Sequence, residues 1–164
     1  MQPNTPQPGF APYGRPLKPR VNATAAVVAG SLALLTVGMV VWFTLYNVVY
    51  ATESADHVSG PVVQNLIGGV VGAGALAVAA GFTFARRIAG AWTLSALCAL
   101  YVLAIFVAAP LLWGTPFSVH LGWIFGFDKS NGVAVALTVI FAILTAIMAA
   151  IAGSVRSSGE KARG

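Results

Sequence analysis

The chain has 164 residues, of which 58% are hydrophobic and 8% are charged, and its formal net charge is +5. Because soluble domains carry roughly 25% charged residues, this composition excludes an ordinary soluble fold, and the high hydrophobicity excludes a charged disordered chain. The single cysteine, Cys98, excludes an internal disulfide framework and a cysteine-based metal cage, which leaves an all-α, polytopic membrane protein.

Residues 1–22 form a proline-rich segment before the first apolar stretch. They hold six of the nine prolines, and proline removes a backbone donor and interrupts helices. We therefore expect a disordered Pro-rich N-terminal leader, a transmembrane domain over residues 23–155 and a polar cytoplasmic tail over 156–164. Asn22 is the expected N-cap of the first helix because its side chain accepts from free backbone N–H groups.

Four apolar stretches predict four membrane-spanning helices. At about 1.5 Å per residue, each is long enough to cross a hydrocarbon layer of about 30 Å. Their approximate bounds are 23–50, 62–84, 88–113 and 133–155. Two outer loops, 51–61 and 114–132, and a short turn at Arg86–Arg87 connect them, so we expect an antiparallel four-helix bundle. A cleavable signal peptide is the alternative for the first stretch, which exceeds the about 7 to 15 apolar residues of such signals.

Basic residues divide unevenly between the two sides of the predicted helices. Eight of the nine share the side of both termini, and Lys129 alone lies opposite. The eight are Arg15, Lys18, Arg20, Arg86, Arg87, Arg156, Lys161 and Arg163. The positive-inside rule predicts that both termini are cytoplasmic and that the protein is a multi-pass protein of the cell (inner) membrane, in contact with the lipid bilayer. The positive charge is then a topological signal, so we expect no nucleic-acid partner.

No Asp, Glu, Lys, Arg or His falls within the four predicted spans. An ionisable side chain at membrane depth is costly and is retained where ions or protons are handled. Its absence argues against a proton relay, a voltage sensor and a membrane-embedded catalytic residue, so we expect no enzyme and no cofactor. The hydroxyls that remain are expected to bond within helices or between them, and a substrate path is the alternative.

Small residues recur along the second span and predict close helix contact there. Residues at every fourth position, with a glycine pair on the adjacent stripe, would let another backbone approach. These helix-packing residues are Asn65, Gly68, Gly69, Gly72, Ala73, Ala77 and Gly81. The contact is expected either with a neighbouring helix of the same chain or with another protein. Asn65 is also a candidate partner for Asn47 across the first outer loop.

The second outer loop, 114–132, is rich in large apolar side chains with helical spacing. We expect a short amphipathic or re-entrant element in the interface, which either docks on lipid or a partner or merely caps the helices. The residues expected to form this outer-loop docking surface are Phe117, Leu121, Trp123, Ile124 and Phe127.

The two histidines, His57 and His120, fall one in each outer loop. Together with one of the carboxylates Glu53, Asp56 and Asp128 they are candidates for a weak metal site, and together with Asp128 for an enzyme acting on lipids at the outer face. Their spacing matches no helix-borne pair of metal ligands, so the preferred interpretation is that both are solvated loop residues and that no metal binds.

The proline-rich leader, the basic residues Lys18 and Arg20 before the first span, and the Ala/Val/Gly-rich helices resemble small four-span membrane proteins of actinobacterial type. The likeness covers the architecture of the whole chain. Some such proteins are accessory subunits of respiratory or cell-envelope complexes. The resemblance implies a non-catalytic accessory or scaffolding subunit, contacting other membrane-protein subunits or further copies of itself. A small oligomeric transporter or channel, lined by threonines and Asn65, is the alternative.

Overall fold

The computed structural model of the chain describes residues 21–53, 60–127 and 129–154, and every regular element in these ranges is a helix. Four helical stretches are long and apolar enough to cross a membrane, which confirms the all-helical, membrane-spanning expectation at that level. The predicted leader up to residue 20, His57, Asp128 and the tail lie outside the described residues.

The described helices differ from the expected ones mainly near the second outer loop. Their bounds are α1 Ala23–Glu53, α2 Gly60–Phe84, α3 Ile88–Leu103, the π-helix η1 Ala104–Ala108, α4 Ala109–Trp113, α5 Phe117–Phe125 and α6 Ser130–Gly153. The third apolar stretch is therefore one continuous path through α3, η1 and α4. The last helix starts at Ser130 rather than residue 133, with Lys129 at its N-cap position, and the Asn131 side chain in its first turn accepts from the Gly132 N–H at 2.9 Å.

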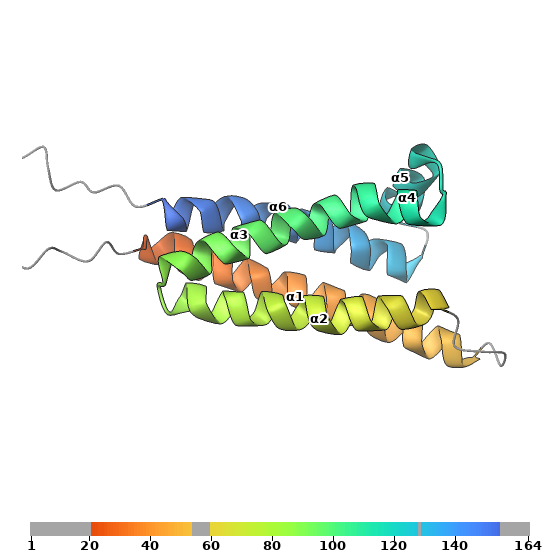
Figure 1. Ribbon diagram of the computed structural model, residues 1–164, viewed down its shortest axis with the longest axis horizontal. Coiled ribbons are helices and arrows are strands. Elements are labelled where there is room, and N and C mark those ends of the chain that lie inside the picture. Colours follow the sequence, from red (N-terminus) through yellow and green to blue (C-terminus); the bar gives the residue numbers. More distant parts are fainter. Residues whose placement is uncertain (1–20, 54–59, 128, 155–164) are drawn as a thin grey trace, which may run out of the picture.

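The long helices lie side by side, and consecutive ones run in opposite directions (Figure 1). α1 packs against both α2 and α6, while α3 packs against α6 and α2. One end of this assembly carries the Arg86–Arg87 turn and is called the basic end. The other end carries α5 and is called the α5 end.

Small buried side chains form the contact faces of α1 and α6. The buried positions of α1 recur three or four residues apart at Ala26, Ala29, Ala33, Thr36, Val40 and Thr44. Those of α6 recur in the same way at Thr138, Ala142, Thr145, Ala149 and Ala152. Because lipid tails are as apolar as the side chains, helices in a bilayer gain from close backbone approach rather than from burying large apolar groups.

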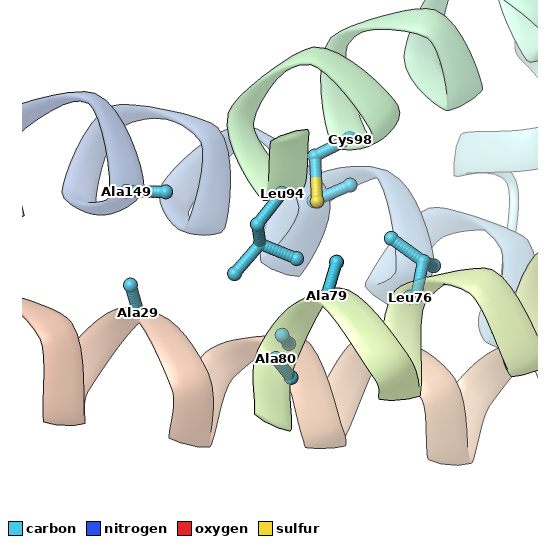
Figure 2. Close-up of a cluster of buried hydrophobic side chains, with 9 residues drawn as sticks. Ala29, Leu76, Ala79, Ala80, Leu94, Cys98 and Ala149 are labelled. Atoms are coloured by element: carbon cyan, nitrogen blue, oxygen red, sulfur yellow. The ribbon is translucent and has the colours of Figure 1, made fainter. Parts of the chain in front are cut away.

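The centre of the assembly joins all four long helices. Leu76 and Ala79 of α2 meet Leu94 and Cys98 of α3, with alanines of α1 and α6 beside them (Figure 2). Leu94 and Cys98 are completely buried, and Leu76 is 2% exposed. This cluster fills the space between the helices with no polar side chain.

Most buried hydroxyls are satisfied by their own helices. Thr44, Thr83 and Thr138 donate to the carbonyl four residues earlier at 2.8, 2.8 and 2.7 Å. Ser95 donates instead across helices, to the Ala146 carbonyl at 2.9 Å. Among the buried threonines that the structure describes, Thr145 is the exception, since its hydroxyl has no partner there. Hydroxyls thus serve mainly the helix backbone and the α3–α6 contact.

The contact between α1 and α2 can be tested by substitutions at two adjacent glycines of α2. A Cβ added at Gly69 would collide with Thr44 Oγ1, whereas a Cβ at Gly68 would meet nothing within 4 Å. We expect Gly69→Ala to lower the free energy of unfolding by about 1–3 kcal/mol, the usual cost of overpacking. Gly68→Ala should leave it unchanged or raise it slightly, because alanine favours helix more than glycine does. Unfolding in detergent followed by circular dichroism measures both, and equal effects would contradict the described α1–α2 contact.

Candidate functional site

A cavity of about 350 Å³ lies at the α5 end between α2 and the path formed by α3, η1 and α4. Toward the α5 end it is lined by Trp113, His120 and Trp123, and toward the middle of the helices by Tyr101 and Thr138. Gly68 and Gly69 form its α2 wall. Most of the lining surface is apolar, and the polar side chains are few.

The wall opposite α2 is shaped by the π-helix and Pro110. In η1 the hydrogen bonds span five residues, as shown by the Ala109 N–H that donates to Ala104 O. The next bond of this kind would join residue 110 to Ile105 O. Proline has no N–H, so the Ile105 carbonyl is left without a donor from its own helix. In a hydrocarbon layer such a group must find a partner elsewhere in the protein.

His120 of α5 supplies that donor. Its Nε2 lies 2.9 Å from Ile105 O, and because a carbonyl only accepts, the proton is on Nε2. The imidazole is 5% exposed and stacks on Trp123 with 6.2 Å between ring centroids. The expectation that His120 is a solvated loop residue is therefore wrong. It fails because α5 folds back over the helix ends and places the ring against a carbonyl that the π-helix and Pro110 leave free.

The sequence contains a signal for this arrangement that the motif analysis missed. A proline inside a predicted span releases a carbonyl four or five residues earlier, and His120 is the titratable donor ten residues after Pro110. A donor within reach of a proline-released carbonyl is a specific pairing to look for in membrane helices.

Three polar side chains in the cavity have no hydrogen bond with any residue that the structure describes. They are Gln64, Asn65 and Tyr101. Asn47, the candidate partner of Asn65, donates instead to Phe43 O at 2.7 Å. The Tyr101 ring is held across the space between helices, since a Cβ at Gly72 would lie 3.3 Å from its Cε2. Donors and acceptors are thus available inside a mostly apolar cavity.

Some residues of the second outer loop pack on the ends of the long helices, and others are exposed. Ile124 is completely buried against Val135 and Ala136 of α6, with Trp123 packed beside them. Leu121 is half-buried. Phe117 and Phe127 are 54% and 56% exposed. α5 therefore closes the α5 end of the cavity with one face and presents aromatic rings on another.

The small residues expected to form one face of α2 are partly buried and partly exposed. Gly69 and Ala73 are buried, and Asn65 and Gly72 are half-buried. Gly68, Ala77 and Gly81 are exposed. Residues four apart drift by about 40° per step around a helix with 3.6 residues per turn, so one such series cannot stay on one face. The buried side of α2 continues instead through Leu76, Ala80 and Thr83.

In the described part of the chain, no three His, Cys, Asp or Glu side chains lie close enough together to hold a metal ion. His57 and Asp128, the other members of the candidate outer-face site, lie outside the described residues. Their relation to His120 stays untested.

Comparisons with protein-family models, curated proteins and solved structures find no match to this chain.

Replacement of His120 by phenylalanine tests the buried hydrogen bond. An aromatic ring is retained but the Ile105 carbonyl loses its donor, so we expect the free energy of unfolding to fall by about 1–3 kcal/mol. Amide hydrogen exchange over residues 117–125 should accelerate as α5 loosens. Ser118→Ala, at an exposed position of the same helix, is the matched control and should change neither quantity.

Replacement of Pro110 by alanine tests the origin of the free carbonyl. It restores an N–H at position 110, which can pair with Ile105 O or with the carbonyl four residues earlier. In this background His120→Phe should cost about 1 kcal/mol less than in the natural chain, a coupling measured by a double-mutant cycle. Strictly additive costs would show that Pro110 and His120 do not share this carbonyl.

Proposed function

We propose that the chain is a non-catalytic accessory or scaffolding subunit of a larger complex in the bacterial inner membrane, possessing its own lipid-facing surface and a docking face for another membrane helix. The four apolar helices are compatible with an integral membrane protein in contact with the lipid bilayer. The observation that supports the proposal is a face of α2 made of small residues on which none of the described residues packs.

This face contains Gly74, Ala77 and Gly81. All three are exposed, and a Cβ added at Gly74 or Gly81 would meet nothing within 4 Å. Their spacing of three and four residues puts them on one side of the helix. Glycine costs about 1 kcal/mol relative to alanine in a helix, so the chain's own fold gains nothing from it here. Small residues that face outward favour close approach of a helix from another subunit.

A groove beside this face fits the same use. It has a volume of about 540 Å³ and runs between α2 and α3, from Gly74 and Val78 to Phe82 and Thr93. A helix of another subunit could contact the small residues and pack its side chains into this groove.

The α5 end offers a second contact area. Phe117, Val119, Phe125 and Phe127 of this region are each more than 40% exposed. Aromatic side chains at the end of membrane helices suit both the bilayer interface and a protein partner. They support a complex in which contact continues beyond the hydrocarbon layer.

The basic end is proposed to be cytoplasmic. Arg86 and Arg87 are exposed there, between α2 and α3, and the Arg87 guanidinium lies 5.3 Å from the centre of the Phe82 ring. The positive-inside rule supports the same side for both chain termini, since α1 begins and α6 ends at this end.

The buried threonines do not favour the channel alternative. Thr36, Thr44, Thr83, Thr138 and Thr145 all lie within the single chain. A pore between copies would therefore keep only Thr93 and Asn65 of the residues expected to line it. Within one copy, the cluster around Leu76, Leu94 and Cys98 fills the space between the helices on the basic-end side of the cavity.

The test compares three variants of the full chain purified from its native membrane in mild detergent. Gly74→Leu and Gly81→Leu should each weaken association with the partner subunits about 5- to 150-fold and lower their recovery accordingly, since overpacking an interface costs about 1–3 kcal/mol. Ala99→Leu, at an exposed alanine of α3 that lines neither the cavity nor the groove, is the control.

Quantitative mass spectrometry of the co-purified proteins reads the result. Unchanged recovery in both glycine variants would overturn the docking face. Recovery of the natural chain as a lone monomer, under conditions that preserve other membrane complexes, would overturn the accessory role itself.

A further inference from the structure

We propose that the cavity at the α5 end binds an uncharged lipid whose polar end carries a hydroxyl or carbonyl group. This site is separate from the α2 docking face, because Gly74, Ala77 and Gly81 do not line it. The cavity of about 350 Å³ falls within the range of about 300–1,000 Å³ typical of small-molecule sites. It is large enough for a polar end group with the first part of its tail.

The absence of charge in the lining selects the ligand class. None of the residues that line the cavity is Asp, Glu, Lys or Arg. A phosphate or ammonium group inside it would have no counter-ion, and burying an unpaired charge costs several kcal/mol. The Nε2 proton of His120, which a buried anion would need, is already donated to Ile105 O. An uncharged end group is the one that fits.

Unpaired polar side chains point to hydrogen bonding with that end group. The Tyr101 hydroxyl and the amides of Gln64 and Asn65 have no partner among the described residues. Tyr101 and Asn65 are half-buried, whereas Gln64 is exposed. In a layer without water a buried unpaired group is costly, so polar atoms at membrane depth are expected to have partners. A ligand hydroxyl can accept from and donate to these groups, and a carbonyl can accept from the Tyr101 O–H or an amide N–H.

The cavity opens on the flank of the helices, toward the surrounding lipid. Gly68, Ala104 and Leu112 line it and are also exposed on the flank of the helices. α3 and α4 diverge from α2 toward this end (Figure 1). A molecule dissolved in the bilayer can therefore enter from the lipid, place its polar end near Tyr101 and leave its tail among the lipid chains.

The experiment uses the full chain with Trp42, Trp92 and Trp113 replaced by phenylalanine. Trp123, which lines the cavity, is then the sole tryptophan, and it is excited at a wavelength that tyrosine does not absorb. The protein is reconstituted in phosphatidylcholine vesicles and titrated separately with two quenching probes. One is a monoacylglycerol brominated near its ester group, which presents hydroxyls. The other is decylubiquinone, which presents carbonyls. Phosphatidylcholine brominated at the same positions as the monoacylglycerol is the reference.

We expect saturable quenching of Trp123 by one or both uncharged probes, at a mole fraction about tenfold below that needed with brominated phosphatidylcholine, a difference equivalent to about 1.4 kcal/mol. Saturation by the monoacylglycerol alone assigns a hydroxyl lipid, and saturation by the quinone alone assigns a carbonyl one. Quenching that rises without saturation, or at the same mole fractions for all three lipids, shows ordinary bilayer contact and overturns the proposal.

Two variants in the same Trp123 background locate the site. Tyr101→Phe removes one hydrogen bond and should weaken binding about 3- to 10-fold. Gly68→Leu places a side chain at the cavity wall, where a Cβ meets nothing within 4 Å, and should abolish the saturable component. Ala99→Leu should leave it unchanged. Saturable quenching that survives both Tyr101→Phe and Gly68→Leu at full strength would place the ligand elsewhere and overturn the assignment.

The lipid titration uses the isolated chain in defined vesicles, so a negative result does not bear on the accessory role. Recovery of the natural chain as a lone monomer, in turn, does not bear on the lipid site.

Discussion

Close approach of helix backbones is the constraint on which the rest of this structure depends. In a hydrocarbon layer, two helices gain little by hiding apolar side chains from lipid, so they associate where small side chains let their backbones come together. α1 and α6 meet through alanines and threonines such as Ala29, Ala33, Ala142 and Ala149. Glycine is required where approach is closest, as at Gly69 against Thr44 and at Gly90, where a Cβ would lie 2.7 Å from the backbone carbon of Phe82.

The same constraint explains where the cavity forms. α3 and α2 are held together near the basic end by Gly90 and by the cluster around Leu94 and Cys98. Toward the α5 end the third apolar stretch widens into a π-helix and then passes Pro110. π-helical turns are rare and are found frequently at functional sites. Small residues such as Gly68 and Ala108 line this wider space without filling it.

Backbone hydrogen bonding then ties the end of the cavity to the rest of the chain. The carbonyl that Pro110 leaves free is bonded by His120, and Ile124 on the same short helix is buried on α6. α5 is thus fixed at two points, one polar and one apolar. A loop without these contacts would leave the cavity open to water at that end, and its unpaired carbonyl would cost free energy in the membrane. The proposed docking face of α2 and the cavity lie on different parts of the helix, so the proposed partner helix and lipid would not compete.

The sequence alone was sufficient to predict an all-helical chain with four helices long and apolar enough to cross a membrane, because a run of uncharged apolar residues of that length has few other stable environments. It also predicted a helical element in the second outer loop, from the spacing of Phe117, Leu121 and Ile124. Only the tertiary structure decided which residues touch. The four-residue series on α2 drifted off the contact face because a helix turn is 3.6 residues long, so Gly69 is buried while Gly81 is exposed. Its position in a loop predicted that His120 is solvated. The structure instead buries it against the Ile105 carbonyl, 15 residues earlier in the chain, which has no donor from its own helix. Periodicity and composition report which side chains tolerate lipid, but the pairing of a free carbonyl with a distant histidine depends on how helices cross, and that is a property of the packed chain.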